Sequence, residues 1–485
     1  MLQSSRRLIG TFVSSASRHL KLPSYEASTL PAPSFSAFSS SSFSSSSTAP
    51  AFAPVTALSE EEAAVRDAAR AFARAEIAPR VLAMDAAGAI DPAVVKGLFE
   101  QGFMGLESAP EHGGAGAGFM SAVLVIEELA RIDASVATMA DIQLTISSNV
   151  VRSNGSKALQ DFALPRLAKG TLGAFALSEA GSGSDAFALK TVARRVEGGA
   201  AFELTGTKQW ISNSREAGLF LVFANADPAA GYKGITCFLV PRDAKGLSVG
   251  RPEDKLGIRA SSCCPLTLEG VRVPADRVVG EVGQGYKIAI ETLNEGRIGI
   301  AAQMLGLAQG AMDAALPYLF QRKQFGSRIG DFQGMQHQYA QAATEIEAVR
   351  CLTYNAARLK MAGSPFVREA AMAKLLASQV AERTASKAVE WMGGMGFVRE
   401  SKVEKYYRDA KIGAIYEGTS NIQLKDVYPP PKELTHRPPT HPPLTPLPLG
   451  GTSRAAQSQS SWRATTGRPS RAGARPRSKG VELTE

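Results

Sequence analysis

From Ser59 onward the hydrophobic positions follow a helical period. Val65 and Phe72 fall at helical intervals behind Ser59-Glu60-Glu61-Glu62, a tetrapeptide with the spacing of a capping box. Asp91-Pro92 has the residue types of a helix N-cap followed by a first-turn proline. The pattern predicts an N-terminal helical domain over residues 55–170.

Between residues 171 and 278 the period changes to that of short strands. Apolar runs at 202–207, 219–223 and 235–240 are separated by Gly, Asn, Asp and Pro turns, and no helix of useful length interrupts them. This pattern predicts a small antiparallel β-barrel or sandwich as the middle domain.

Residues 279–424 return to helical spacing in three long segments. The stretch 298–312 carries no charge, but it contains Gln303 and Gln309 and meets Asp313 too soon to span a membrane comfortably. Small residues on every side instead predict a buried helix in a tight four-helix bundle. The expected fold class is therefore a multidomain α and β protein, with a barrel between two helical domains.

The two ends of the chain differ from this body. Residues 1–50 are rich in Ser and Arg, almost lack acidic residues and have no continuous apolar core, which is typical of an organelle transit peptide. A disordered tail is the alternative for this segment. Residues 427–485 are rich in Pro, Ser, Arg and Gly, which predicts a disordered C-terminal tail.

The distribution of charge along the chain argues against nucleic-acid binding by the globular part. The 485 residues carry a formal net charge of +9. Residues 1–50 contribute four basic side chains against one acidic, and residues 427–485 contribute nine against three. The globular part is thus electroneutral, so it offers no basic surface for a nucleic acid.

Cysteine and histidine are too sparse for several kinds of site. Four cysteines form no CxxC pair, which suits a reducing compartment. Outside the two ends the only histidines are His112 and His337. We therefore expect no metal site and no Ser-His-Asp triad.

Two segments of the middle domain carry candidate chemistry. The Gly- and Ser-rich turn at 178–185 offers backbone N–H groups and hydroxyls to a phosphate or a ring carbonyl, although such a turn is more often only a loop. It lacks the third glycine of a dinucleotide fingerprint. Trp210, within 208–213, could stack on a flat cofactor or lie half-buried in the core.

Two further segments lie in the C-terminal part. Arg322, just beyond a helix and followed by Gln333, could clamp a pyrophosphate or be a solvated helix end. Glu417 precedes Thr419-Ser420-Asn421, which has the character of a helix N-terminus. Alone, Glu417 would be a cap or dipole complement, and its functional alternative is a general base on a glycine-flanked loop.

Together, the order and spacing of these segments resemble the acyl-CoA dehydrogenase family over residues 55–424, most closely its short/branched-chain type. The motifs that carry the resemblance are Glu295-Gly296-Arg297, Gln324-Phe325-Gly326, Glu390-Trp391-Met392-Gly393-Gly394, and Arg408-Asp409-Ala410-Lys411 through Asn421.

The resemblance implies an FAD enzyme that removes a hydride from Cβ of an acyl-CoA thioester after a carboxylate takes the Cα proton, giving a trans-2-enoyl-CoA. It places the base at Glu417. Isovaleryl-type members carry the base at the position of Gly296, which cannot serve, and Glu295 is one residue off. Burial must raise the pKa of such a base.

The resemblance also assigns contacts to individual residues. Flavin contacts are expected from Phe175, Leu177, Ser178, Gly183, Ser184, Trp210, Ile211, Ser212, Thr419, Ser420 and Asn421, and from a neighbouring subunit's Arg322, Gln333, Glu390, Trp391, Met392, Gly393 and Gly394. Substrate contacts are expected from Ser184, Tyr232, Tyr286, Asn294, Glu295, Gly296 and Arg297. Implied partners are electron transfer flavoprotein and further copies in a homotetramer, in the mitochondrial matrix.

The chain departs from the family's pattern at its C-terminal end. The family's last helix normally continues, whereas here residues 425–428 lead directly into Pro429, leaving about two turns. We interpret 427–485 as a non-homologous terminus. Two alternatives to a dehydrogenase remain open: an acyl-CoA oxidase of the same fold, and a non-catalytic member disabled by this change.

Overall fold

The computed structural model describes residues 53–428, and the predicted transit segment 1–50 lies outside them. Of the predicted tail 427–485, Val427 is instead the last residue of a helix, and residues 429–485 lie outside the described residues. The N-terminal part is helical as predicted. Ser59 caps the first helix through a complete capping box with Glu62, and Asp91 caps the helix that begins at Pro92. Its helices are α2 Glu60–Phe72, α3 Val81–Ala87, α4 Pro92–Glu100, α5 Phe119–Ala130, α6 Ala134–Asp141, α7 Asn149–Asn154 and α8 Lys157–Lys169.

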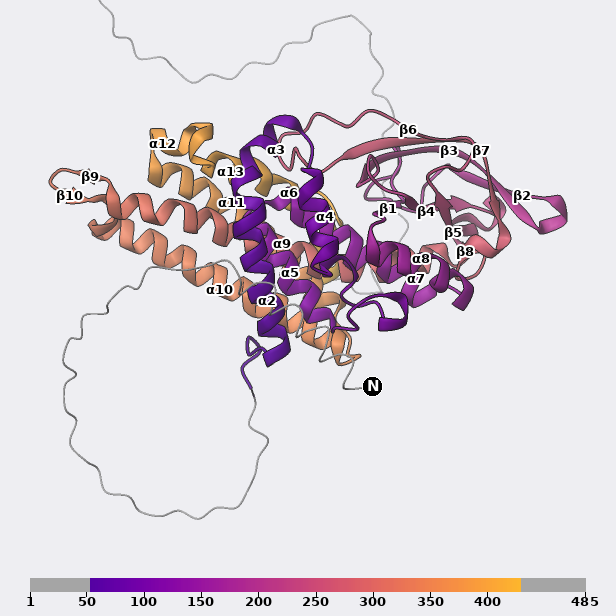
Figure 1. Ribbon diagram of the computed structural model, residues 1–485, viewed down its shortest axis with the longest axis horizontal. Helices are drawn as coiled ribbons and strands as arrows, with labels where there is room; N and C mark the ends of the chain where they lie inside the picture. Colours follow the sequence, from indigo (N-terminus) through magenta and orange to yellow (C-terminus); the bar gives the residue numbers. More distant parts are fainter. Residues whose placement is uncertain (1–52, 429–485) are drawn as a thin grey trace, which may run out of the picture. The chain divides into compact units, whose positions relative to one another are not determined.

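The middle part is a sheet of eight strands that lie together beside α7 and α8 (Figure 1). The strands are β1 Gly173–Ala176, β2 Val192–Val196, β3 Ala201–Ser212, β4 Leu219–Asn225, β5 Ile235–Pro241, β6 Leu247–Val249, β7 Cys263–Pro274 and β8 Val278–Val279. The main path runs β6-β7-β3-β2-β4-β5-β8, and β1 pairs with β4.

The predicted antiparallel pairing holds for most neighbours but not for all. β4 pairs in parallel with β1 along four residues and with β2 at one residue, Val192 with Asn225. The pairs among residues 53–428 form an open path from β6 to β8, so the hydrogen-bonded ladder does not close into a ring. The chain reaches β4 from β1 through β2 and β3, and from β2 through β3, so neither parallel pair is joined by a direct turn.

The apolar runs of the central strands reflect burial on both faces. In β4, Leu219, Leu221 and Phe223 pack toward α7, α8 and the start of the next long helix, whereas Phe220 and Val222 pack into the sheet's own core. A strand covered on two sides has no solvent face, and its sequence therefore shows no alternation.

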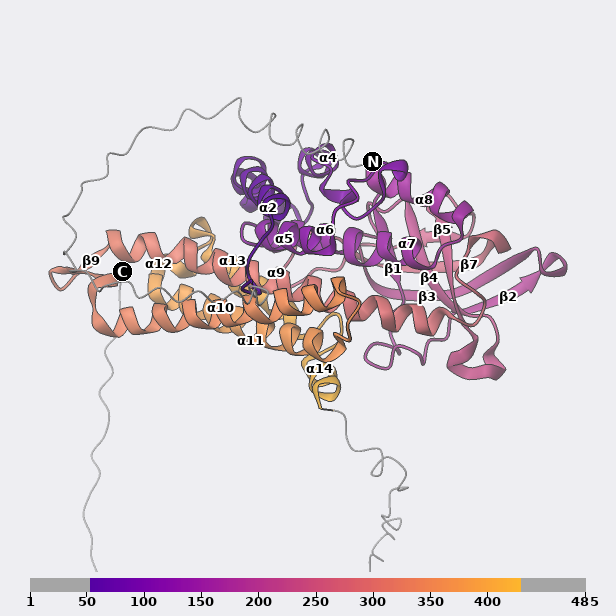
Figure 2. The ribbon, with the colours of Figure 1, turned by 90° about the horizontal axis from the view of Figure 1, so that it is seen from below.

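The C-terminal part contains three long helices with shorter ones against them. They are α9 Gly285–Gln321, α10 Gln333–Met361, α11 Val367–Met392, α12 Gly394–Phe397, α13 Val403–Ala410 and α14 Ser420–Val427, with a small hairpin β9 Lys323–Gln324 and β10 Ser327–Arg328. α9 packs on α11 and α5, α13 packs on both α9 and α11, and α14 lies along α11 (Figure 2).

The stretch 298–312 is the middle of α9 and is almost wholly buried against neighbouring helices, as its small residues predict. Within residues 53–428, no helix combines the length and the apolar character needed to cross a bilayer. Close helix contact here depends on glycine, because a Cβ at Gly306 would lie 2.1 Å from the carbonyl oxygen of Glu127 in α5.

We therefore expect Gly306→Ala to destabilise the protein by about 1–3 kcal/mol, because an added methyl must push the backbones of α5 and α9 apart. The same substitution at Gly334 in α10 is the control, since its Cβ would meet nothing within 4 Å. Because alanine has the higher helix propensity, the free energy of unfolding of Gly334→Ala should equal that of the parent or exceed it by up to about 1 kcal/mol. Equal thermal unfolding midpoints of the two variants would contradict the proposed contact.

Candidate active site

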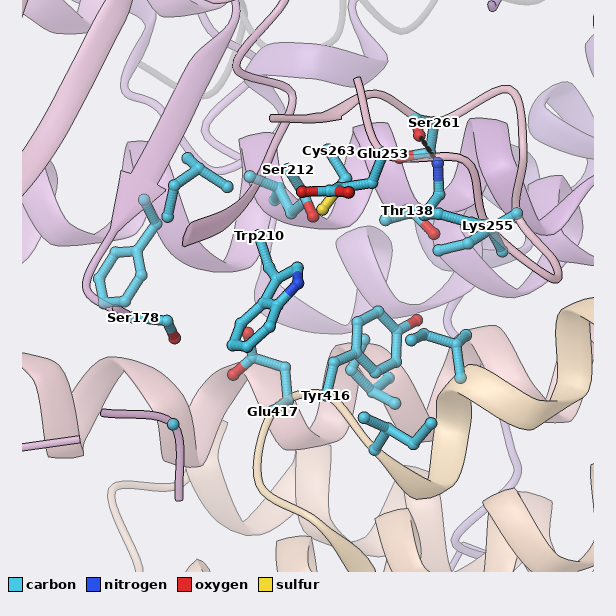
Figure 3. A pocket seen from close by; sticks show the side chains of 18 of the residues that line it. Thr138, Ser178, Trp210, Ser212, Glu253, Lys255, Ser261, Cys263, Tyr416 and Glu417 are labelled. Carbon is cyan, nitrogen blue, oxygen red and sulfur yellow. Dashed lines mark hydrogen bonds between the residues drawn. The ribbon is translucent and has the colours of Figure 1, made fainter. Parts of the chain in front are cut away.

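A cavity of about 700 Å³ lies between the sheet and the helices (Figure 3). Its sheet side includes eight of the residues that the sequence suggested for a flavin: Phe175, Leu177, Ser178, Gly183, Ser184, Trp210, Ile211 and Ser212. The segment before α14 lines the opposite side with Tyr416, Glu417, Gly418 and Thr419. Two distant segments of the chain thus meet across one cavity.

Other expected residues do not line this cavity. Ser420 and Asn421 belong to the first turn of α14, just beyond Thr419. The residues expected to serve a neighbouring subunit also lie outside it, and most are exposed: Arg322, Gln333, Glu390, Gly393 and Gly394 are exposed, while Trp391 and Met392 are buried in α11.

Trp210 reaches the cavity because β3 bulges next to a proline of β7. Gln209 and Trp210 together stand opposite the single residue Pro265, which cannot donate a hydrogen bond to the ladder. Trp210 adopts a left-handed backbone (φ 57°), and its side chain is 54% exposed. The half-buried core position is therefore wrong for Trp210, and its indole presents a flat aromatic surface to the cavity (Figure 3).

Glu417 is not a helix cap. α14 begins after Thr419 without a side-chain cap bond, and Glu417 itself has a left-handed backbone (φ 51°) followed by Gly418 (φ 84°). This rarely populated conformation turns the carboxyl toward α9, where a Cβ at Gly296 would lie 3.1 Å from its Oε2. Oε2 is shielded from solvent and has no hydrogen-bond partner in the described chain.

The surroundings of Glu417 make it a better base than an ordinary carboxylate. Burial in the cavity wall raises its pKa to about 7, and the nearby charges of Lys374 and Arg297 oppose part of that rise. The residue as a whole is partly accessible, and it lines the cavity. A carboxyl with this pKa exchanges a proton near neutral pH.

A second carboxyl that the sequence did not reveal lies in the same wall. Asp141, at the end of α6, is buried and lines the cavity; its Oδ1 accepts a hydrogen bond from Thr145 and its Oδ2 has no partner among residues 53–428. Burial raises its pKa to about 8, with a further contribution from the charge of Glu417. No local pattern marks Asp141, because a helical segment of mixed residues surrounds it.

Two glycines of α9 make room for the two carboxyls. Gly299 faces Oδ1 of Asp141, at 2.0 Å from where a Cβ would stand, and Gly296 faces Glu417. Residues three apart lie on one face of a helix. Asp141 and Glu417 therefore approach neighbouring points of the same face of α9, which explains why the charge of Glu417 raises the pKa of Asp141.

Tyr416 links this wall to α6 and α9. Its hydroxyl bonds to Oε1 of Gln303, and the Gln303 side-chain amide donates to Thr138 Oγ1 at 2.6 Å and to the carbonyl of Ala134 at 2.8 Å. Thr138 and Tyr416 both line the cavity. The network fixes the residue next to Glu417 to two helices.

Of the residues expected near substrate, Ser184 lines the cavity, and most of the others form two groups outside its wall. Tyr232 and Tyr286 pack edge to face with ring centroids 5.1 Å apart. Arg297 is buried and pairs with Asp426 of α14 at 2.7 Å, whereas Glu295 pairs with Lys360 at 3.0 Å. Glu295 thus points away from Glu417, as its position one residue off predicts.

The cavity suits a flat aromatic cofactor with polar substituents. Trp210 and Phe175 supply aromatic surface, and Ser178, Ser184 and Ser212 supply hydroxyl groups on the same side. Opposite them stands a carboxyl whose buried oxygen has no partner. No group of His, Cys, Asp or Glu residues suited to a metal ion occurs within 53–428. These residues fit a flavin placed between Trp210 and Glu417.

Sequence comparison matches three models of one family along the chain. Residues 59–171 match the acyl-CoA dehydrogenase N-terminal domain, 174–271 the middle domain and 283–428 the C-terminal domain. The short/branched chain specific acyl-CoA dehydrogenase, mitochondrial, of Rattus norvegicus is 55% identical over 376 residues, which are 78% of this chain and 87% of the rat protein.

Structural comparison gives the same family. Butyryl-CoA dehydrogenase from Megasphaera elsdenii has a TM-score of 0.75 at 38% identity, covering 76% of this chain and 98% of its own. A glutaryl-CoA dehydrogenase from Mycobacterium smegmatis in complex with FADH2 has a TM-score of 0.72 at 28% identity, covering 76% and 94% of the two chains.

The second carboxyl yields a prediction on stability. Because folding raises the pKa of Asp141, the folded state retains a proton that the unfolded chain loses above about pH 4, so the group costs increasing stability up to about pH 8. Asp141→Asn should therefore raise the unfolding midpoint relative to the parent, by an amount that grows between pH 5 and 8. Thermal unfolding across this range checks the trend, and a pH-independent difference would contradict it.

Proposed function

Because this chain belongs to the acyl-CoA dehydrogenase family and is thus an FAD-dependent oxidoreductase, we propose that it oxidises short or branched-chain acyl-CoA thioesters to trans-2-enoyl-CoA with Glu417 as the base. The single observation that carries the assignment of the base is a carboxyl of raised pKa that faces the cavity opposite Trp210. The rat relative's name supports the substrate class.

Residues of the sheet side of the cavity would hold the flavin. Trp210 and Phe175 would contact its ring, and the hydroxyls of Ser178, Ser184 and Ser212 would accept or donate hydrogen bonds. When bound, the flavin supplies the two-electron oxidation by accepting a hydride from the substrate's Cβ.

Glu417 would take the Cα proton onto a carboxylate oxygen. Its unpartnered Oε2 and its pKa of about 7 favour that role, because the group is largely ionised just above neutral pH and still basic enough to hold a proton. The backbone N–H of Glu417 makes no hydrogen bond within residues 53–428 and so is free to donate to the developing enolate oxygen.

The acyl group would occupy the apolar part of the same cavity. Ile146, Leu293, Ile300, Ile412 and Ile415 line it. Such a wall excludes water from the reacting carbons, which strengthens the effect of each nearby charge. The Tyr232–Tyr286 pair, with Asn294 and Arg297, lies outside this wall and would meet other parts of the thioester.

We further propose that electron transfer flavoprotein reoxidises the enzyme, that four copies assemble, and that the enzyme works in the mitochondrial matrix. Exposed Phe325 (96%) and Phe397 (82%) support assembly, since large exposed apolar side chains mark contact surfaces. Arg322 and the 390–394 segment lie outside the chain's own cavity, which is consistent with service to a neighbour's flavin. The rat relative is named a mitochondrial protein.

Glu417→Gln should slow bleaching of the bound yellow flavin by 2-methylbutyryl-CoA by roughly 10²–10⁴-fold, because the amide cannot accept the Cα proton. Stopped-flow absorbance under anaerobic conditions measures the rate. Glu295→Gln, which alters a neighbouring carboxyl paired with Lys360, is the control and should keep most of the rate. Bleaching of Glu417→Gln at the parent's rate would refute the base.

The acyl preference can be measured on the same signal. Bleaching by 2-methylbutyryl-, isobutyryl- and butyryl-CoA should be fast compared with that by a long straight-chain thioester, because the proposed substrates are short or branched. The bleaching rates of the three short substrates should differ by no more than about 10–200-fold, the range for one methylene.

The electron acceptor can be tested after bleaching. Addition of electron transfer flavoprotein should restore the yellow colour faster than oxygen does. The reverse order would favour an oxidase.

A further inference from the structure

Lys374 of α11 is a buried cation that the proposed chemistry leaves unexplained. Its side chain is completely inaccessible to solvent. Among residues 53–428, two other lysines are buried, and both have carboxylate partners: Lys208 pairs with Glu179, and Lys405 pairs with Asp133 and Asp409. Lys374 forms no such pair within residues 53–428, and its Nζ instead donates to the Gly418 carbonyl at 2.7 Å.

An unpaired buried ammonium is costly, so its location requires a reason. The carbonyl that it holds follows the Glu417 residue directly. Removing the charge from water lowers the pKa of Lys374 to about 8, yet the charge of Glu417 works against that decrease. Lys374 is therefore electrostatically linked to the proposed base, although the two side chains form no hydrogen bond in the described structure.

The backbone at this point needs support. Glu417 and Gly418 are consecutive left-handed residues, and a non-glycine residue in that region stores strain. Two buried side chains hold their carbonyls. Gln423 Nε2 donates to Glu417 O at 3.0 Å and to Gly418 O at 2.9 Å, while Lys374 donates to Gly418 O.

The groups facing Glu417 come from three other helices. α11 contributes Lys374, α9 contributes Arg297 and α6 contributes Asp141. Arg297 pairs with Asp426 of α14 at 2.7 Å, and Asp141, whose pKa is raised to about 8 by burial and by the charge of Glu417, is largely protonated where Glu417 ionises. Lys374 is the one facing cation in the described chain whose charge no carboxylate partner offsets.

We propose that Lys374 is the positioning residue of the base: it fixes the Gly418 carbonyl so that Glu417 faces the cavity, and its buried charge favours the ionised form of Glu417. This inference rests on the proposed role of Glu417. Gln423 shares the mechanical part of the task but contributes no charge.

Three variants separate charge from mechanical support. Lys374→Met removes both, Lys374→Gln retains an amide donor without charge, and Gln423→Leu removes hydrogen bonds without altering charge. Ser378→Ala is the matched control, because Ser378 lies one turn further along α11, is buried, and bonds to the Gly413 carbonyl at 2.7 Å, in the segment leading to Glu417.

The readout is single-turnover bleaching of the bound flavin by 2-methylbutyryl-CoA between pH 6 and 9. In the parent, the rate should rise with pH through about 7, as Glu417 ionises. Both Lys374 variants should move that rise upward by about one pH unit, because loss of a positive charge raises the pKa of a nearby carboxyl. Lys374→Gln should converge with the parent above pH 8, where Lys374 itself loses its charge, whereas Lys374→Met should keep a lower plateau because it also loses the hydrogen bond to the Gly418 carbonyl.

Gln423→Leu should lower the plateau rate by roughly tenfold without moving the rise, and Ser378→Ala should change neither. Flavin absorbance and the thermal midpoint are recorded for every variant. If Lys374→Met cannot be purified with flavin, the pH dependence of bleaching is measured with Lys374→Gln alone, since its amide can still reach the Gly418 carbonyl.

An unmoved pH rise in the Lys374 variants, or an equal loss of rate in Ser378→Ala, would overturn the proposal and leave Lys374 as packing alone. If no Lys374 variant retains flavin while Ser378→Ala does, the residue serves folding and the proposal is also wrong. Failure of the proposed function appears differently, as absence of bleaching in the parent enzyme with every acyl-CoA at every pH.

Discussion

Exclusion of water from the Glu417 carboxyl is the constraint on which the rest of the site depends. A carboxyl in water is too weak a base for a Cα proton, and burial against Gly296 raises its pKa to about 7. That burial requires three conditions: α9 must present glycine, the Glu417-Gly418 backbone must be left-handed, and α14 must bring Gln423 beneath the turn. Each condition comes from a different segment of the chain.

Buried ion pairs around the cavity hold its walls in place. Asp409 receives the N–H of Ile258 at 2.6 Å and also binds Lys405, so the wall formed by residues 253–258 is tied to α13. Glu179 and Lys208 fix the start of the Gly- and Ser-rich turn in the same way. Ion pairs of this kind add little net stability, but they fix positions, and a cavity that binds a rigid cofactor depends on fixed walls.

The shortened last helix does not disconnect the base. α14 has only eight residues, as Pro429 predicts, yet its buried Gln423 holds both carbonyls of the turn and its Asp426 pairs with Arg297. A helix of two turns is marginal by itself, so packing on α11 and the ion pair with Arg297 of α9 must hold it in place. The structural reason for suspecting a non-catalytic chain is thereby weakened.

Local patterns determined much of this protein. Capping at Ser59 and Asp91, the long apolar strands and the small-residue stretch of α9 follow from spacing and propensity, and Glu417 followed from a resemblance of motifs. Only the tertiary structure decided the parallel pairing of β1, the exposure of Trp210 at the bulge opposite Pro265, and the meeting of Asp141 and Lys374 with Glu417. The reason is physical: periodicity records whether a side chain is buried, whereas the partner that it meets depends on how distant segments pack.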